Sequence, residues 1–505
     1  MNTTSNISTN TCTQSTCSST ANLENTDDYY VQQFNTGCLS QFSYYIESDK
    51  EAAIIDPVRE SDMYIDLLEK RGAKLKYVIE THFHADFVSG HVELANLTGA
   101  KIVFGPNAKP EYEALVCEEG EELNLGNIKL KIFHTPGHTM ESTSYILIDP
   151  KDKPKAIFTG DFLFLGEVGR PDLAVGGSIT EKDLASHLYE SILKLKQTIP
   201  DDVIVFPGHG AGSACGKNIS TGTKDTLGNQ KKTNYALNDN LKKEEFIEIV
   251  TTNLPTPPQY FFFGVMMNKK GYEAMEKVLE KTKKEIKPEE FVKLVTENND
   301  VVIIDSRDSN ESIKGFFRGS YLISLKITYA IWSATLFSPE QKIILITDPG
   351  KERESIIRLA RVGYENILGY VEGGYDNLQK YCSENGLSEY ITSITTVDPS
   401  KYKELIEEII DKDTIQLIDV REKSEWESTG IVPNSKLIPL GQLEKNIEEF
   451  IAIGKQKPLG VFCKAGGRAS IAGSILKKYQ IPKVYFFGGI LNMIEKKISL
   501  KPFKF

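Results

Sequence analysis

All seven histidines of this 505-residue chain lie between residues 82 and 209. The spacing places His82, His84 and Asp86 at alternating positions, so their side chains can converge on one point. Short apolar runs of strand length precede these residues and three later ones, which are His138, Asp161 and His209. Folds of the α/β class place their sites at the ends of strands, and histidine and aspartate are common metal ligands. The pattern therefore predicts an α/β domain built around a metal site.

The predicted metal domain covers residues 29–240. Apolar runs such as KYVIE and DVIVF recur there, separated by Gly, Pro or Asp, and helical stretches lie between them. The remaining histidines, His91, His134 and His187, are interpreted as structural or surface residues, and His187 lies in the helical stretch LASHLYE.

The order HxHxD, PGHT, FTGD and PGHG resembles the metallo-β-lactamase superfamily. This resemblance implies an αββα sandwich with the metal at one edge of the sheets. Hydrolytic members such as glyoxalase II carry HxHxDH and bind two metal ions. Here Phe87 follows Asp86, so a ligand of the second ion is missing and a single metal is favoured.

The longer strings ETHFHADFVSGH and GDFLFLGEVGRPDL resemble the persulfide dioxygenase branch of that superfamily. The resemblance implies one Fe(II) per chain, held by His82, His138 and Asp161. Two histidines and one carboxylate leave positions open for O2 and substrate, whereas a hydrolase would favour a second cation or a strongly acidified water. By the same resemblance His84, Asp86 and His209 would orient the ligands or the substrate, although they bind metal in hydrolytic relatives.

Two further residues of this domain have alternative interpretations. Arg170 could bind a substrate carboxylate or the forming oxidised sulfur group, or it could pair with Asp172. Cys215 could relay sulfur, with Lys217 favouring its thiolate, or it could be a buried loop cysteine. The sequence leaves both questions open.

The C-terminal part of the chain contains an internal repeat, over residues 296–390 and 400–505. Each copy has a strand ending in Asp-Ser-Arg or Asp-Val-Arg, then helix, strand, loop, helix and strand, and finally a Gly-Gly pair. This order predicts two α/β domains. The predicted fold class is thus α/β multidomain, a metallo-β-lactamase αββα sandwich followed by two rhodanese-like α/β domains.

The second copy contains FCKAGGRAS, a short loop between a strand and a helix that begins at Cys463. Backbone N–H groups of such a loop and the helix dipole stabilise a thiolate or persulfide. The segment resembles the rhodanese sulfurtransferases, together with DVRE and the later FFGGI. The resemblance implies that Cys463 carries the persulfide, that Lys464 and Arg468 flank an anionic substrate, and that Asp419 and Arg421 are structural.

The first copy resembles rhodanese in outline, through DSRD and EGGY, but its loop reads TDPGKERES. The resemblance predicts Asp348 at the position of the nucleophile. We therefore expect a degenerate domain without a catalytic cysteine, which serves as a spacer or an interface.

The remaining segments and the composition limit which parts of the chain fold, what it binds and where it is located. Residues 1–28 are nearly all Ser, Thr and Asn and predict a disordered tail, and residues 241–295 predict a linker with helices. No run approaches 18 apolar residues, which excludes a membrane helix. A net charge of −11 argues against nucleic acid as the main partner. Seven scattered cysteines and no Lys or Arg before Lys50 favour the cytoplasm and are compatible with a mitochondrial location.

Together these motifs resemble fusions of a persulfide dioxygenase with rhodanese domains in sulfide detoxification. The predicted reaction is iron-dependent oxidation of a low-molecular-weight thiol persulfide by O2 to sulfite, coupled to sulfur transfer that forms or uses thiosulfate. The thiol, glutathione or coenzyme A among others, is open, and a homo-oligomer is compatible with the sequence. The alternatives are a glyoxalase II-like thioester hydrolase with an attached sulfurtransferase, and a non-catalytic persulfide sensor.

Overall fold

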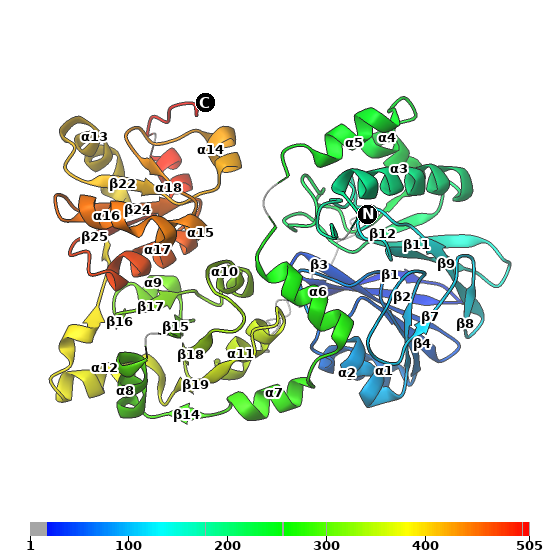
Figure 1. Ribbon diagram of the computed structural model, residues 1–505, viewed down its shortest axis with the longest axis horizontal. Helices are drawn as coiled ribbons and strands as arrows, with labels where there is room; N and C mark the ends of the chain where they lie inside the picture. Colours follow the sequence, from blue (N-terminus) through cyan, green and yellow to red (C-terminus); the bar gives the residue numbers. More distant parts are fainter. Residues whose placement is uncertain (1–17, 177, 255–256, 299, 497, 504–505) are drawn as a thin grey trace, which may run out of the picture. The chain divides into compact units, whose positions relative to one another are not determined.

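The computed structural model describes residues 18–176, 178–254, 257–298, 300–496 and 498–503. These residues form two compact units (Figure 1). The first comprises residues up to 257 together with 265–272, and the second comprises residues 258–264 and those from 273 onwards. Each unit has hydrophobic cores of its own.

The first unit contains two stacked sheets. The described strands of one sheet, in spatial order, are β1 (Ser18–Asn25), β2 (Tyr30–Thr36), β3 (Gln41–Ser48), β4 (Glu51–Ile55), β5 (Lys74–Ile79), β6 (Lys101–Phe104) and β7 (Leu115–Val116). Those of the other sheet are β13 (Asp225–Thr226), β12 (Ile204–Pro207), β11 (Pro154–Gly160), β10 (Thr143–Ile148), β9 (Ile128–His134) and β8 (Glu122–Leu125). The helices are α1 (Asp62–Arg71), α2 (His91–Thr98), α3 (Glu181–Thr198), α4 (Leu227–Thr233), η1 (Tyr235–Leu237) and α5 (Lys243–Thr251).

The core between the sheets is built from both of them. Tyr44 of β3 and Ile55 of β4 meet Leu130, Tyr145 and Phe158 of the second sheet, and all five side chains are buried. The helices α1 and α2 cover the outer face of the first sheet, and α3 covers that of the second (Figure 1). Strand β3 is buried along its whole length because it lies inside this sandwich. The predicted αββα sandwich is confirmed.

The predicted disordered tail needs a correction where the chain is described. Residues 1–17 lie outside the described residues, but Ser18–Asn25 form strand β1, which pairs antiparallel with β2. An edge strand gains its stability from backbone hydrogen bonds to its neighbour, so a polar segment can occupy it without an apolar face of its own. Composition alone does not reveal this pairing.

The second unit contains two sheets with the same strand order. In spatial order, the first is β14 (Glu285–Ile286), β19 (Ile367–Val371), β18 (Lys342–Ile346), β15 (Val301–Asp305) and β17 (Ser320–Leu322), as described. The second is β21 (Thr395–Thr396), β25 (Val484–Gly489), β24 (Leu459–Cys463), β22 (Gln416–Asp419) and β23 (Lys436–Leu437). All neighbouring strands in both sheets are parallel. The two copies of the sequence repeat therefore have one topology.

Helices and short elements complete the two repeats. Around the first sheet lie α7 (Met275–Thr282), α8 (Pro288–Glu297), α9 (Ser309–Ser312), α10 (Tyr329–Leu336), α11 (Glu352–Ala360), α12 (Gly374–Glu384), η2 (Ser388–Tyr390) and the pair β16 (Phe316–Phe317) and β20 (Ile391–Thr392). Around the second lie η3 (Pro399–Lys401), α13 (Tyr402–Lys412), α14 (Lys423–Thr429), α15 (Leu440–Leu443), η4 (Glu444–Asn446), α16 (Ile447–Gly454), α17 (Gly467–Lys478) and α18 (Ile490–Glu495).

The predicted linker, residues 241–295, is instead divided between the two units. Helix α5 packs on α3 in the first unit, and α6 (Tyr260–Lys270) has residues in both units. Helices α7 and α8 and strand β14 belong to the second unit. The physical reason is that these helices have apolar faces that need burial, as Phe291 of α8 shows with no exposed surface. No helix among the described residues combines the length and the apolar character that crossing a membrane requires.

Candidate metal centre and sulfur-transfer site

The predicted site residues of the first unit lie at strand ends. His82 follows β5, His138 follows β9, Asp161 comes directly after β11, and His209 follows β12. All four side chains are at least 98% buried. The expectation that these positions end strands is confirmed.

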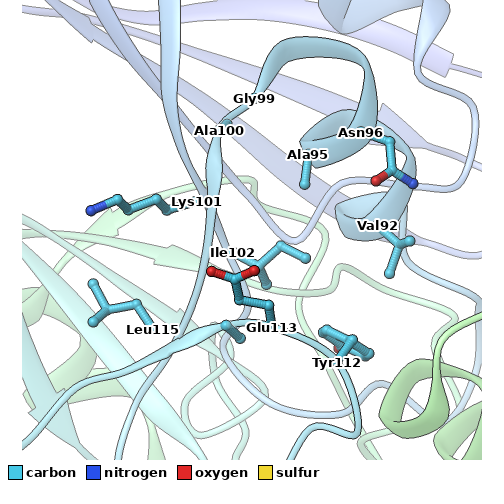
Figure 2. A pocket seen from close by; sticks show the side chains of 11 residues that line it. Val92, Ala95, Asn96, Gly99, Ala100, Lys101, Ile102, Tyr112, Glu113 and Leu115 are labelled. Atoms are coloured by element: carbon cyan, nitrogen blue, oxygen red, sulfur yellow. The ribbon is translucent and has the colours of Figure 1, made fainter.

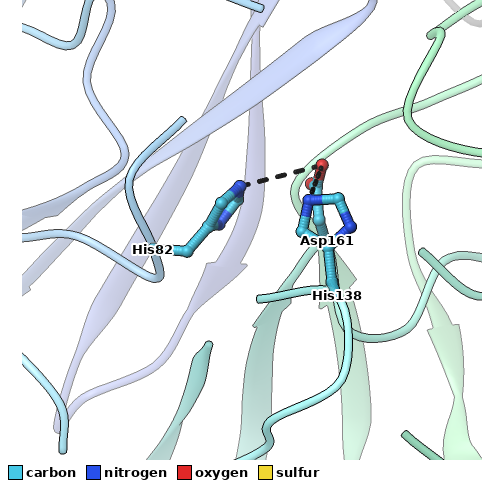
Figure 3. Close-up of side chains that lie close together, drawn as sticks. All are labelled: His82, His138 and Asp161. Carbon is cyan, nitrogen blue, oxygen red and sulfur yellow. Dashed lines mark ion pairs between the residues drawn. The ribbon is translucent and has the colours of Figure 1, made fainter. Parts of the chain in front are cut away.

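Three of these side chains converge (Figure 3). Oδ2 of Asp161 lies 4.0 Å from Nε2 of His82 and 3.7 Å from Nε2 of His138. These separations are too long for hydrogen bonds. Two atoms that bind one metal ion at about 2.0–2.2 Å can be up to about 4.4 Å apart, so a single ion could contact all three.

The Thr81 hydroxyl fixes the ring of His82. It donates a hydrogen bond to Oδ2 of Asp56 at 2.8 Å and lies 2.9 Å from Nδ1 of His82. Since that proton goes to the carboxylate, the oxygen accepts from Nδ1–H of His82. Burial, reinforced by the charge on His84, holds the pKa of His82 well below its ordinary value. His82 is therefore neutral and turns the lone pair of Nε2 towards Asp161.

A backbone carbonyl fixes His138 in the same way. Nδ1 of His138 lies 2.9 Å from the carbonyl oxygen of Arg170, which can only accept, so Nδ1 carries the proton. In the neutral ring this leaves the lone pair on Nε2, facing Oδ2 of Asp161. Metal-binding histidines are commonly oriented by such a partner on the other ring nitrogen.

The fit of a cation follows from what these atoms lack. Oδ2 of Asp161 is buried and has no hydrogen-bond partner among the described residues, and two nitrogen lone pairs face it. Burial acts to raise the pKa of Asp161, but the charge and hydrogen bond of His209 hold it below its ordinary value, so the carboxylate is ionised. Acceptors that converge without a proton between them need a cation, and these residues fit a metal ion.

His209 holds Asp161 in place. Its Nδ1 lies 2.7 Å from Oδ1 of Asp161, and its Nε2 lies 2.8 Å from Oδ2 of Asp86. Burial acts to lower the pKa of His209, but the two carboxylates raise it well above its ordinary value, so both ring nitrogens donate. His209 and Asp86 thus act on the three-residue cluster through Asp161.

His84 points to a different group of acids. Its Nε2 lies 3.0 Å from Oδ1 of Asp56 and 3.6 Å from Oε2 of Glu80. Burial opposes the charge, but Asp56 raises the pKa of His84 to about 9. The ring of Phe87 lies 4.4 Å from that of His84, so an apolar side chain fills the space where a second ligand would be expected in HxHxDH proteins.

Two residues that support this site were missed by sequence reasoning. Asp56 has a φ of 50° at the end of β4 and binds both the amide and the hydroxyl of Thr81. Asn268, from α6, donates to the carbonyl oxygens of His84 and Phe87, each at 2.8 Å, and accepts from the amide of Ser89. The run EAAIID, with an aspartate ending a strand as in FTGD, could have indicated Asp56. Asn268 carries no such signal because it lies far away in the sequence.

Arg170 is paired with Asp172 in the structure. Its Nε and Nη2 donate to the two carboxylate oxygens of Asp172, each at 2.6 Å, and Nη1 donates to the carbonyl of Ala214. The side chain is only 3% exposed. The structural Arg–Asp pair is therefore formed, and Arg170 contributes to the site through the carbonyl that holds His138.

Cys215 lies beside Asp86 and His209, with its sulfur within 4.8 Å of their ligand atoms. Burial and the neighbouring carboxylates raise the pKa of its thiol well above the ordinary value. Lys217 points elsewhere, because its Nζ donates to the backbone carbonyls of Ile249 and Thr252. The expectation that Lys217 favours a Cys215 thiolate is therefore wrong. The ammonium group of Lys217 instead binds backbone carbonyl oxygens at and just after the C-terminal end of α5.

Gly169 offers a test of the cluster's packing. A methyl group on Gly169 would lie 1.9 Å from the carbonyl oxygen of Asp161 and 3.0 Å from Nδ1 of His138. We expect Gly169→Ala to weaken divalent-metal binding at least about tenfold, as loss of a ligand-orienting contact does. Gly176→Ala is the matched control, because a methyl group there meets nothing within 4 Å. Metal content after loading and dialysis measures both, and equal retention would contradict this geometry.

A cavity of about 610 Å³ in the first unit lies apart from the three-residue cluster (Figure 2). Residues of α2, β6 and the segment 112–115 line it. Tyr112, one of them, lies 2.6 Å from Nε2 of His91 through its hydroxyl. None of the described residues that line this cavity is a candidate metal ligand of the cluster.

In the second unit, Cys463 is the last residue of strand β24, and residues 464–466 separate it from helix α17. Its sulfur is buried and accepts a hydrogen bond of 3.0 Å from the amide of Gly466. The second glycine of FFGGI lies against this loop, because a methyl group on Gly489 would be 2.5 Å from the carbonyl of Lys464. The loop thus places a thiol beside a backbone N–H group at a helix N-terminus, as the sequence predicts.

The two cationic residues of the loop differ in their surroundings. Lys464 is exposed. Arg468 makes a two-pronged ion pair with Glu425, at 2.6 and 2.7 Å, and its guanidinium lies 6.0 Å from the ring centre of Trp332. Arg468 is therefore engaged by protein groups, and Lys464 is the cation of the loop that is open to solvent.

The strand register corrects the position of the missing nucleophile. Asp305 pairs with Ile346, and the equivalent Asp419 pairs with Phe462. The residue after Phe462 is Cys463, so its counterpart is the residue after Ile346, which is Thr347 rather than Asp348. The loop of the first copy is one residue longer before its helix, which is why matching its letters by eye misplaces the nucleophile.

The first copy also contacts the helix that follows Cys463. Ser309 lies 3.2 Å from Ser470 between their hydroxyl oxygens, and the side-chain hydroxyl of Ser474 accepts from the amide of Leu322. A methyl group on Gly467 would be 2.7 Å from the side chain of Ile327. The first copy therefore packs against α17 of the second copy.

Comparison with known proteins places both units. Residues 36–209 match the metallo-beta-lactamase superfamily, and residues 402–495 match the rhodanese-like domain. Hydroxyacylglutathione hydrolase GloC of Haemophilus influenzae is 31% identical over 230 residues, covering 41% of this chain and 95% of that protein. The mitochondrial persulfide dioxygenase ETHE1 of Homo sapiens is 30% identical over 226 residues, covering 44% of this chain and 80% of that protein.

A solved structure extends the likeness. A metallo-beta-lactamase from Staphylococcus aureus subsp. aureus COL is 30% identical with a TM-score of 0.60, covering 68% of this chain and 99% of that chain. The two named enzyme activities occur among relatives at nearly equal identity, so the comparisons identify the family and not the reaction. The chain belongs to the metallo-beta-lactamase superfamily and also contains a rhodanese-like domain.

Proposed function

We propose that the first unit is a mononuclear iron persulfide dioxygenase and that Cys463 transfers sulfur. The observation that carries the proposal is the orphaned Oδ2 of Asp161, which faces Nε2 of His82 and of His138. Two histidines and one carboxylate form the ligand set of non-haem Fe(II) oxygenases. Bound ferrous iron would supply open positions for O2 and for the persulfide sulfur.

The chain's own residues orient these ligands. Thr81 and Asp56 set the proton position on His82, the carbonyl of Arg170 sets that on His138, and His209 holds Asp161. His209 gives both nitrogens to carboxylates, and Phe87 stands beside His84, which supports one metal ion rather than two.

The proposed reaction converts R–S–SH, O2 and H2O into R–SH, sulfite and two protons. The outer sulfur is oxidised, O2 is reduced, and the S–S bond breaks. Cys463 would then pass sulfane sulfur between a persulfide and sulfite, so that R–S–SH and sulfite give R–SH and thiosulfate, or the reverse. Placing both activities on one chain raises the effective concentration of the shared intermediates.

The test is O2 uptake by anaerobically purified, iron-loaded protein with glutathione persulfide and with coenzyme A persulfide. We expect uptake with one iron per chain and sulfite or thiosulfate as product, and the better carrier identifies the thiol.

The alternative is a glyoxalase II-like thioester hydrolase with an attached sulfurtransferase. It is favoured by the relative GloC, to which the chain is 31% identical, and by a second candidate metal-binding group formed by Asp86, His209 and Cys215. Two metal ions per chain, hydrolysis of a glutathione thioester and no O2 uptake would establish it instead.

A further inference from the structure

A cavity of about 410 Å³ lies in the first rhodanese-like domain, at the carboxyl end of strand β18. Its lining includes Arg307, Lys314, Thr347, Asp348, Tyr375 and Gln379. Since Thr347 is the counterpart of Cys463, this cavity occupies the place of the sulfur-transfer site in the other domain. Its volume lies within the range of small-molecule sites.

Two buried hydroxyl groups in this lining have no partner. Oγ1 of Thr347 and Oη of Tyr375 make no hydrogen bond with the described residues, and these side chains are 1% and 6% exposed. Buried polar groups in folded proteins are nearly always satisfied by protein, water or a ligand. Two orphaned hydroxyls in one cavity therefore indicate a polar occupant.

The charge of the loop is reversed relative to the sulfur-transfer site. Thr347 is followed by Asp348, whereas Cys463 is followed by Lys464. Glu311 and Asp376 also line the cavity. Glu311 is paired with Lys314 at 2.7 Å, so Asp348 and Asp376 are the carboxylates that disfavour a bare anion such as thiosulfate and favour an ammonium group.

The cavity also offers a place for a carboxylate. Arg307 gives Nε and Nη2 to Asp305, and Nη2 also to the carbonyl of Gly315, but Nη1 makes no hydrogen bond with the described residues. In the other domain the equivalent Arg421 uses Nη1 to bind Glu425 and Thr429. A guanidinium nitrogen left unpaired at a cavity is a strong donor for a carboxylate.

We propose that this cavity binds a small zwitterion of the α-amino-acid type, with its ammonium group at Asp348 and its carboxylate at Nη1 of Arg307. The domain then acts as a binding module without chemistry, because Thr347 provides no thiol. This inference does not depend on the proposed function of the first unit.

The experiment uses the full chain and S-methylglutathione, which carries an α-ammonium and an α-carboxylate but no thiol that could react at Cys463. Isothermal titration measures the affinity, and hydrogen exchange locates the binding. We expect protection of residues 347–352 and 373–379 from exchange. Asp348→Asn should raise the ligand concentration needed for half-maximal protection of these segments at least about tenfold, because it removes the partner of the ammonium group. Asp411→Asn, an exposed aspartate elsewhere, is the matched control and should change nothing.

Three outcomes would overturn the proposal. One is the absence of protection in these two segments at ligand concentrations up to about 10 mM. Another is unchanged protection in Asp348→Asn at the same ligand concentrations. The third is equal protection by cadaverine, an amine without a carboxylate, which would make the cavity a simple cation site. Circular dichroism checks that each variant is folded, and since Asp348 is exposed its replacement leaves the core intact.

Discussion

Replacing His82 with alanine is expected to remove both the bound metal and the O2 uptake with a persulfide. Nε2 of His82 lies 4.0 Å from Oδ2 of Asp161, and only one other nitrogen, that of His138, faces the same oxygen within the cluster. Removing one of the three proposed ligands should lower the metal affinity by more than the roughly 10–100-fold loss that is typical when a supporting residue is removed. We expect metal content near background and an O2-uptake rate lowered at least about 100-fold, measured by elemental analysis and an oxygen electrode.

Two further variants sharpen this test. His187→Ala is the matched control, because that histidine is exposed on α3, and it should keep full activity. Thr81→Val removes the hydroxyl that sets the proton on His82 and should give an intermediate loss of about 10–100-fold. O2 uptake that survives in His82→Ala, with metal still bound, would show that other residues hold the metal.

Replacing Cys463 with serine is expected to abolish sulfur transfer while leaving O2 uptake intact. The Cys463 sulfur accepts a hydrogen bond from the amide of Gly466 at the N-terminus of α17, where a helix favours a bound anion. A serine hydroxyl does not attack sulfane sulfur, so thiosulfate:cyanide sulfurtransfer should fall by about a thousandfold or more. Sulfite would then accumulate in place of thiosulfate during persulfide oxidation.

Lys464→Gln provides the graded comparison for this loop. Lys464 is exposed and so can be replaced without disturbing the core. If it attracts the anionic substrate, the variant should raise KM for thiosulfate several-fold, by roughly the modest energy of an exposed charge, and leave kcat nearly unchanged. Sulfur transfer that persists in Cys463→Ser would place the nucleophile on another cysteine.

The parts of the site that sequence predicted are those set by local order. His82, His138, Asp161 and His209 each follow an apolar run, and a strand end fixes where such a residue lies in an α/β fold. The Cys463 loop was readable for the same reason, because strand, loop and helix are contiguous. The repeat was visible because both copies keep the same order of elements.

The parts that sequence did not predict depend on contacts between distant segments. Asn268 reaches the HxHxD loop from α6, and the strand β1 exists through its pairing with β2. Lys217 binds backbone carbonyls and Arg468 binds Glu425, and these partners lie outside the sequence motifs that contain the two residues. Register between strands, rather than letter-by-letter matching, identified Thr347.

The Asp–Arg pair occurs in both copies of the C-terminal repeat with nearly the same geometry. Arg307 binds Asp305 through Nε at 2.9 Å, and Arg421 binds Asp419 through Nε at 2.9 Å, and all four side chains are buried. Equal strand order and an equal pair show that the two copies share one structural framework. One copy has Thr347 where the other has Cys463, yet both keep the pair, so the groups required for folding are separate from the group required for chemistry.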